Sequence, residues 1–439
     1  MQILPSRIAS PELKVPALKL RLPSLLGRGS AKSLVGLDIQ PGFVAAVQAR
    51  VNGRILAERA ATMALPADSM RDGEVLDEGA LAETLRELFA GSGLSKRVRV
   101  GVANQRTVLR TLELPPVTDP KELAAAVNFQ AQDQVPMPLN NAVMDFHPLG
   151  IVDTPAGPRQ RVVLVAAQRD MIERLLKAVR QAGLSAEGVD LSAFALIRSL
   201  YRPEPAPPAE GEQPGRVLYL NVDGLTNLAI AEGTVCRFTR VVGTGLEGMA
   251  SELAERRSIA LTDARALLMG VDLTAPAPGM HGSDAVAPSA DEASSHDDEI
   301  AAEPGEEREP LSAEEAEQGE REMSYEELTA LEEAPAPAAT AQSDADLWAV
   351  LENGIRDISG EVRNSLDFHR SQDGGGEVSH VVMSGCAQDI PGFADALKAT
   401  LGVEVRCAEV GVLDASLAET VSLHRLAVAT GLSAAEAPQ

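Results

Sequence analysis

One pattern occurs twice in this chain and restricts its fold more than any other feature. Residues 33–39 form a short apolar segment with Asp38 near its end, and a Pro41-Gly42 turn leads into a second apolar segment. Residues 216–224 repeat this arrangement and end at Gly224. A strand, a polar turn and a returning strand in each half indicate duplication of one α/β unit. A phosphate-type ligand would lie between the halves, at the turns.

The first half contains further patterns that predict its elements. Asn52-Gly53 is a strong hairpin signal, and an apolar stripe predicts a helix over 78–90. The pattern over 104–182 predicts strand, helix, strand, strand and helix, with Asp119-Pro120 at the start of the first helix. We therefore expect a first lobe at 34–201, formed by 34–103 and 183–201, with a subdomain inserted at 104–182.

The second half follows a linker at 202–215 that is rich in proline and glutamate. Leucine, isoleucine and valine spaced by three or four residues predict a long helix from about Asp346 to Ser371. A final helix is expected over 415–429. The second lobe is therefore expected to comprise 216–274 and 346–431, with a short tail at 432–439.

The formal net charge of −25 is concentrated in an insert at 275–345, where Arg308 and Arg321 are the only bases. This segment has too few large apolar residues to offset the entropy of an ordered chain, so we expect it to be disordered. It is either a solvated spacer or a docking segment for a basic partner. The extension at 1–33 is basic and rich in leucine and proline. It is either a flexible solubilising tail or a segment that adsorbs weakly to an anionic membrane surface.

Several classes of protein are disfavoured. The acidic balance argues against a nucleic-acid binder, and the absence of a long apolar run predicts no membrane-spanning helix. The three cysteines fit no disulfide or zinc spacing, which favours a reducing cytoplasm. The six histidines form no paired motif, so no metal site is expected.

A family resemblance becomes visible when short stretches are taken in their order along the chain. They include Val35-Gly36-Leu37-Asp38-Ile39, Asp72-Gly73-Glu74-Val75, Val135-Pro136-Met137-Pro138, Ser365-Leu366-Asp367-Phe368-His369-Arg370, Ser384-Gly385 and Ile390-Pro391-Gly392-Phe393. In this order the stretches resemble the PilM family, the actin-like proteins of type IV pilus assembly, and more distantly FtsA. The similarity covers about 34–270 and 346–431. It implies an α/β, actin-like fold of two lobes (duplicated and ribonuclease H-like) with an inserted strand-helix-strand-strand subdomain.

The resemblance also implies an ATP site with magnesium between the lobes, from which this sequence departs at each loop. Gln40 and Pro41 stand where the first loop has Gly and Ser, and Pro41 removes an N–H donor. Asn221 replaces an expected Asp, and Asp223 puts a negative charge where phosphate would approach. A lysine expected around Leu268 is absent. The candidate nucleotide-site residues are Asp38, Gly42, Asn221, Gly224, Thr226, Gly243 and Gly385.

These departures make ATP and magnesium doubtful cofactors, and no enzyme activity is expected. One interpretation keeps the loops only as hinges of a scaffold, with Asp38 as a turn residue and Cys386 as a small buried one. The alternative is an ATP-binding, FtsA-like protein that changes conformation or polymerises with nucleotide. An active sugar-kinase-type enzyme lacks an identifiable acidic base and intact phosphate loops.

The resemblance further implies a partner, the N-terminal cytoplasmic peptide of a PilN-like inner-membrane protein. The protein would then be a cytoplasmic scaffold at the inner face of the cytoplasmic membrane, held there through its partners, and a basic motor component could bind the acidic insert. An extended peptide would lie in a groove between the inserted subdomain and the first lobe. Candidate lining residues are Phe129, Val135, Pro136, Met137, Pro138 and Phe146. Each could equally belong to the core, which for Phe129 is the favoured interpretation.

Overall fold

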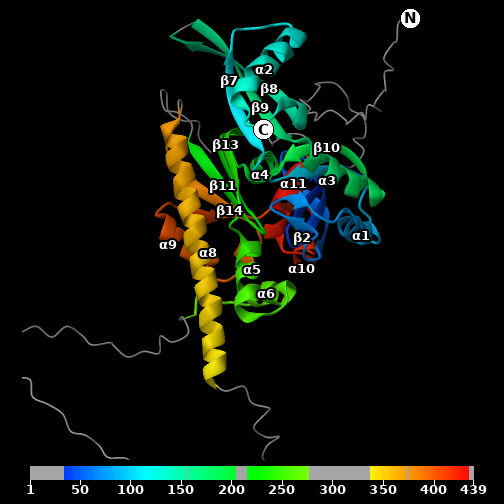
Figure 1. Cartoon of the computed structure of the whole chain (residues 1–439), viewed down its shortest axis with the longest axis vertical. Helices are drawn as coiled ribbons and strands as arrows, with labels where there is room; N and C mark the ends of the chain where they lie inside the picture. Colours follow the sequence, from blue (N-terminus) through cyan, green and yellow to red (C-terminus); the bar gives the residue numbers. More distant parts are fainter. Residues whose placement is uncertain (1–33, 156, 204–214, 276–336, 373–374, 435–439) are drawn as a thin grey trace, which may run out of the picture. The chain divides into compact units, whose positions relative to one another are not determined.

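The computed structural model describes residues 34–155, 157–203, 215–275, 337–372 and 375–434 (Figure 1). Apart from the first residues of one long helix, these described residues all belong to one compact unit. The basic extension at 1–33 lies outside the described residues, as do most of the linker and most of the acidic insert.

The two large sheets confirm the duplication, because five strands of the first sheet, β10-β6-β1-β2-β3, have the same arrangement as the five strands of the second, β15-β14-β11-β12-β13. The first lobe is built on a six-stranded sheet in the order β10-β6-β1-β2-β3-β16. Its strands are β1 (Val35–Gln40), β2 (Phe43–Val51), β3 (Ile55–Ala64), β6 (Arg97–Val102), β10 (Ser185–Leu191) and the short β16 (Gly411–Val412). Strands β1, β2 and β3 form an antiparallel meander, and β6 pairs with β1 in parallel.

The second lobe repeats this topology in a five-stranded sheet with the order β13-β12-β11-β14-β15. Its strands are β11 (Arg216–Val222), β12 (Thr226–Glu232), β13 (Val235–Val242), β14 (Val378–Ser384) and β15 (Val405–Cys407). Strands β11, β12 and β13 again form an antiparallel meander, and β14 pairs with β11 in parallel. Each lobe therefore presents the turn after its first strand to the centre of the molecule, which is the expected actin-like pattern.

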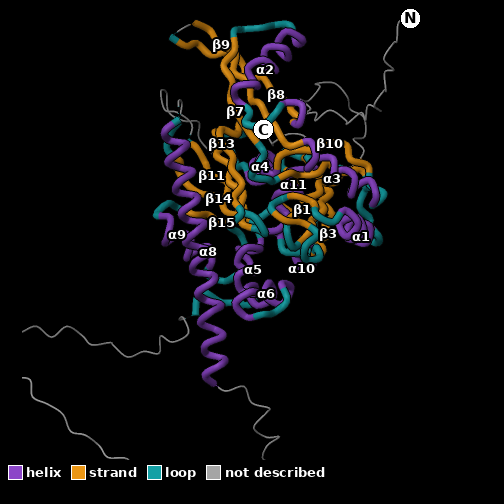
Figure 2. The backbone as a smooth tube through the Cα atoms, viewed as in Figure 1, coloured by secondary structure: helices purple, strands orange, loops and turns teal. Residues whose placement is uncertain are grey.

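Helices cover both sheets, as the ribbon and the tube show (Figures 1 and 2). In the first lobe, α1 (Glu78–Phe89) and α3 (Arg169–Gln181) share a core with alternate residues of β1 and β2, and α4 (Ser192–Leu200) packs against α11 (Ala427–Ser433). In the second lobe lie α5 (Leu246–Arg257), α6 (Leu261–Met269), α8 (Pro337–Ser371) and α9 (Phe393–Leu401). The predicted stripe of α8 is confirmed, since all six of its members are buried: Leu347, Leu351, Ile355, Ile358, Val362 and Leu366.

The inserted subdomain is a three-stranded antiparallel sheet in the order β7-β9-β8, with one helix on it. It contains β7 (Val108–Leu114), α2 (Pro120–Gln134), β8 (Ala142–Thr154) and β9 (Gly157–Gln168). Asp119 caps α2 by accepting hydrogen bonds from the next two amides beyond Pro120, as expected. Leu123, Val127 and Ala131 of α2 pack on the sheet.

Three expectations about boundaries were wrong. Helix α3, assigned to the inserted segment, packs on α1 within the core of the first lobe. Helix α8 begins at Pro337 rather than near Asp346, so 337–345 of the supposedly disordered insert is helical. Proline is well tolerated in a first helical turn and the alanines after it favour a helix.

The expected final helix over 415–429 is also broken, into α10 (Leu417–Thr420), η3 (Leu423–Leu426) and α11. Its last part does not belong to the second lobe or to a tail. Instead α11 packs on β1, β2, β6 and α4 of the first lobe, and Leu432 and Ala434 are buried there. Glycine at position 36 of β1 permits this close packing, because a Cβ there would lie only 1.9 Å from the carbonyl oxygen of Ala429 in α11.

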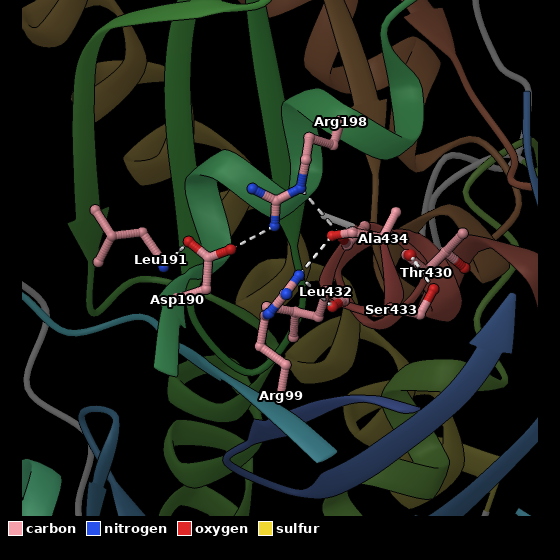
Figure 3. A network of polar contacts seen from close by, with 9 residues as sticks. Arg99, Asp190, Leu191, Arg198, Thr430, Leu432, Ser433 and Ala434 are labelled. Carbon is pink, nitrogen blue, oxygen red and sulfur yellow. Dashed lines mark hydrogen bonds and ion pairs between the residues drawn. The ribbon is translucent and has the colours of Figure 1, made fainter. Parts of the chain in front are cut away.

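Two arginines hold the C-terminal end of α11 (Figure 3). Arg99 of β6 donates to the carbonyl oxygens of Leu432 (3.2 Å) and Ala434 (2.6 Å). Arg198 of α4 donates to the carbonyl oxygen of Gly431 (3.1 Å) and pairs with Asp190. The last carbonyl groups of a helix lack partners within the helix, and these guanidinium groups supply them.

Candidate functional site

Three turns converge between the lobes. The first joins β1 to β2, the second joins β11 to β12, and the third follows β14 and enters η2 (Cys386–Asp389). The first two turns touch, because a Cβ at Gly224 would lie 2.3 Å from the carbonyl oxygen of Pro41. The third lies against β11, where a Cβ at Gly385 (φ +101°) would lie 2.4 Å from the carbonyl oxygen of Val222. The sequence predicted a phosphate-type ligand between the lobes at these turns, and the structure places the turns in direct contact.

The Asp223 carboxylate accepts two hydrogen bonds at the centre of this site. Its Oδ1 accepts from the backbone N–H of Cys386 at 2.6 Å, and its Oδ2 accepts from the side-chain amide of Asn221 at 2.7 Å. The side chain is 1 % exposed. Burial raises the pKa of Asp223 above its usual value, and these hydrogen bonds and the nearby Arg425 guanidinium offset part of that rise. The turn amide is therefore bound to a carboxylate of the chain itself.

The first amides of α5 are also used within the protein. The N–H of Leu246 donates to the carbonyl oxygen of Asp223 at 2.8 Å, and that of Glu247 to the carbonyl oxygen of Gly224 at 3.3 Å. A helix N-terminus attracts anions when its first N–H groups are free. Here those groups bind the second turn instead.

Asp38 lies at the end of β1 and is 1 % exposed. Its Oδ1 accepts a hydrogen bond from Gln40 Nε2 at 3.1 Å, and no described residue donates a hydrogen bond to its Oδ2. Burial, together with the charge of Asp223, raises the pKa of Asp38 to about 7. Within the described ranges, no three His, Cys, Asp or Glu side chains come together so that they could hold a metal ion.

A pocket opens beside the three turns. It has about 460 Å³ of empty space, part of it open to solvent. Its wall includes Phe43, Met269, Arg425 and the Glu247–Arg265 ion pair. Arg265 stands one helical turn before the position where a lysine was expected, so a cation is present. Its guanidinium donates through Nε to Glu247 Oε2 at 2.8 Å, and a Cβ at Gly42 would lie 3.3 Å from it.

Of the other candidate nucleotide-site residues, Thr226 is fully buried and its hydroxyl oxygen has no partner. Gly243 does not lie in any of the three turns. A Cβ added at Gly243 would be 3.0 Å from Gln105 Nε2. Cys386 is buried, and burial with the neighbouring Asp223 charge raises the pKa of its thiol well above normal. It is therefore an unreactive buried residue, as expected.

These residues do not fit a bound phosphate group. The N–H groups of Asp223, Gly385 and Cys386 already donate within the protein, and Pro41 contributes no N–H. The close approach of Pro41 to Gly224 leaves no gap between the first two turns. A phosphate would also meet the charge of Asp223.

The six candidate peptide-binding residues lie on the inserted subdomain and differ in exposure. Phe129 on α2 is 71 % exposed, so the core interpretation of this residue was wrong. Val135 is buried in the subdomain core, and Met137 and Phe146 are half-buried against it. Pro136 and Pro138 are exposed. Strand β8 forms one edge of the sheet, and β9 is the one described strand with which it pairs.

Comparison with known proteins decides the family. The family model described as type IV pilus assembly protein PilM matches residues 36–265, more than half of the 439-residue chain. The chain belongs to the PilM family.

Solved structures agree with this assignment at the level of the fold. A PilM–PilN type IV pilus biogenesis complex aligns with a TM-score of 0.63 and 20% identity, covering 91% of this chain and 97% of that chain. More distant are ethanolamine utilization protein EutJ of Carboxydothermus hydrogenoformans (TM-score 0.44, 14% identity, 95% and 92% covered) and MreB5 of Spiroplasma citri bound to AMPPNP (TM-score 0.43, 12% identity, 92% and 95% covered). The fold is actin-like, as predicted. None of the described helices is both long enough and apolar enough to span a membrane.

Sequence reasoning missed several residues of this PilM-family cleft. Phe43, Arg265 and Arg425 line the pocket, although the sequence singled out none of them. Arg425 Nε pairs with Asp389 Oδ2 at 3.0 Å, and its guanidinium lies 5.8 Å from the ring centroid of Phe43. These residues come from distant segments and have no shared spacing, so only the fold brings them together.

Proposed function

We propose that this PilM-family chain is a scaffold of type IV pilus assembly that binds the N-terminal cytoplasmic peptide of a PilN-like membrane protein. Three observations support the proposal. The family is that of a pilus assembly component, and the structure that aligns with a TM-score of 0.63 is that of a PilM–PilN complex. The inserted subdomain carries an open strand edge and an exposed aromatic side chain.

The edge of β8 is the observation that carries the proposal. An extended peptide can add to such an edge through main-chain hydrogen bonds, with apolar side chains held by pockets and exposed hydrophobic residues. On this subdomain, Phe129 (71 % exposed) and Ile151 of β8 (62 % exposed) offer such apolar contacts. Exposed aromatic residues commonly dominate the binding energy of an interface.

The proposed role needs no catalysis. The donors of the interlobe turns are used within the protein, which supports a scaffold without ATP hydrolysis. The protein would work at the inner face of the cytoplasmic membrane, held there by its partner. A basic motor component as the partner of the acidic insert stays a prediction, because residues 276–336 lie outside the described part of the chain.

A peptide titration tests the proposal. A labelled peptide with the N-terminal cytoplasmic sequence of a PilN-like membrane protein is titrated with wild type and with Phe129→Ser, and fluorescence anisotropy is recorded. We expect at least a tenfold weaker affinity for the variant, with an unchanged melting temperature. Val51→Ser is the matched control, since Val51 is 60 % exposed but lies on β2 of the first lobe. Equal affinities of all three proteins would rule out this surface.

The alternative, an ATP-switched FtsA-like protein, gives a different result. Calorimetry of the wild-type protein with Mg-ATP would then show micromolar binding, and the peptide affinity would change with nucleotide. The proposed scaffold binds the peptide equally well with and without Mg-ATP.

A further inference from the structure

We propose that the Asp223 carboxylate is a resident anion that occupies the oxyanion position of the interlobe cleft, so that the turns are joined without a bound ligand. This inference concerns the cleft and not the peptide surface. It is therefore independent of the peptide titration, and either can fail without the other.

The position of Asp223 in the sheet is the first support. Strands β11 and β14 are adjacent and parallel, with Asn221 opposite Ser384 in the register. The backbone continues from these residues into the second and third turns. The carboxyl ends of parallel strands are where backbone N–H groups of the following turns bind anionic ligands. Asp223 lies at this end of the sheet, and both oxygens of its side chain are used there.

The contacts of the carboxylate are those that a small oxyanion would make. One oxygen accepts a backbone N–H from the third turn (2.6 Å), and the other accepts a side-chain amide (2.7 Å). The cation Arg425 lies near enough to favour the charge of Asp223. Backbone amides, a side-chain amide and a guanidinium together form a typical anion site. Here one side chain of the protein fills it and links the β11–β12 turn to the start of η2.

A comparison with Asp38 indicates which of the two carboxyl groups is ionised. Both carboxylate oxygens of Asp223 accept a hydrogen bond, whereas one oxygen of Asp38 has no partner among the described residues. Hydrogen bonds donated to a carboxylate favour its charged form. The proton of this pair therefore lies on Asp38, and Asp223 keeps the negative charge.

Removal of the carboxylate leaves its donors without a partner. In Asp223→Gly, the amide of Cys386, the amide of Asn221 and the nearby guanidinium face an empty space of the size of a carboxylate. Buried donors without acceptors are costly, so the variant is expected to melt several degrees below wild type. An added small oxyanion should bind in the vacated space and restore stability, as any ligand of the native state does.

The experiment is a thermal titration with inorganic phosphate, with sodium chloride at equal ionic strength as reference. We expect Asp223→Gly to regain more than half of its lost melting temperature, in a saturable manner, by about 50 mM phosphate. Wild type and Leu253→Ala should show only the small, non-saturating rise that phosphate gives to folded proteins in general. Leu253 is fully buried in the second lobe, so its truncation destabilises without opening an anion site.

Two results would overturn the proposal. One is a folded Asp223→Gly variant without a saturable response to phosphate. The other is a wild-type protein that itself responds saturably to phosphate or Mg-ATP. If Asp223→Gly yields no folded protein, wild type decides by amide hydrogen exchange over 385–389. The resident anion requires the N–H of Cys386 to be protected in phosphate-free buffer, and rapid exchange there would refute it.

Discussion

Asp38 near the end of β1 and Asp223 in the turn after β11 lie close enough for the charge of Asp223 to affect the protonation of Asp38. Burial is the larger cause of the raised pKa of Asp38, and the Asp223 charge is the second. Both side chains are 1 % exposed. The two lobes thus meet at a pair of carboxyl groups, one of which is stable in its neutral form.

This pair makes stability depend on pH in a definite direction. The pKa of Asp38 is about 7 in the folded protein and 3.8 in an unperturbed chain. Between these values the folded state binds more protons than the unfolded state, so the free energy of unfolding falls as pH rises. The loss of unfolding free energy caused by ionisation of Asp38 is absent below about pH 4 and complete above about pH 7, where it amounts to about 4 kcal/mol.

Asp38→Asn removes this titration. We expect the variant to gain stability over wild type as pH rises from about 5 to about 8, by about 3 kcal/mol. Urea unfolding at several pH values measures the difference, and comparison with wild type cancels the contribution of acidic groups that do not interact with Asp38. A difference that stays constant across this pH range would contradict the assigned pKa.

Helix α11 provides a test of close packing between glycine and backbone. A Cβ at Gly431 would lie 1.8 Å from the carbonyl oxygen of Ala195 in α4, and backbone cannot move aside as a side chain can. Gly431→Ala should therefore cost about 3 kcal/mol of unfolding free energy. Gly360→Ala is the matched control, because Gly360 also lies in a helix, α8, but a Cβ added there would meet no atom within 4 Å.

The control substitution should have the opposite effect. Alanine has a higher helix propensity than glycine, so Gly360→Ala is expected to raise the unfolding free energy by about 0.5–1 kcal/mol. Denaturant unfolding of both variants gives the two signs. A loss of stability in both variants would contradict the prediction that only Gly431 is restricted by its close contact with backbone.

The Arg198–Asp190 ion pair is largely buried, and Arg198 also binds the C-terminal end of α11, so its removal should be costly. The two side chains are 12 % and 10 % exposed. Arg198→Ala leaves the buried Asp190 without its cation and removes one of the donors to the carbonyl oxygen of Gly431, so we expect a loss of about 3–5 kcal/mol. Arg256→Ala breaks an ion pair with Glu252 in which the side chains are 41 % and 42 % exposed. That control should cost less than about 1 kcal/mol, and a similar cost for both would contradict the role of Arg198.

Much of the fold could be predicted because its signals are local or periodic. The repeated strand and turn predicted the duplicated sheets, the leucine stripe predicted the buried face of α8, and Asp119-Pro120 marked the start of α2. The repeated turns predicted a site between the lobes, and the turns do meet there, because the fold brings together the ends of corresponding strands.

The remaining features depend on contacts between distant segments. The docking of α11 on the first lobe rests on small residues at 36, 101 and 431, which have no periodic signal. The charge of Asp223 was predicted to oppose phosphate, but its hydrogen bond from Cys386 joins residues 163 positions apart. The sequence could not predict that Phe129 is exposed. Only Leu123, Val127 and Ala131 of α2 are buried, and this narrow buried face depends on which side of the helix packs on the sheet.

Phe129 and Phe393 should differ in how much each contributes to the stability of the fold. The Phe129 side chain is 71 % exposed, whereas Phe393 of α9 is fully buried. Phe129→Ala should change the unfolding free energy by less than about 0.5 kcal/mol, and Phe393→Ala should lower it by about 3–5 kcal/mol. Denaturant unfolding of the two variants in the absence of any partner measures both values. A large loss for Phe129→Ala would show that the ring is held by the folded protein and is not free to contact a partner.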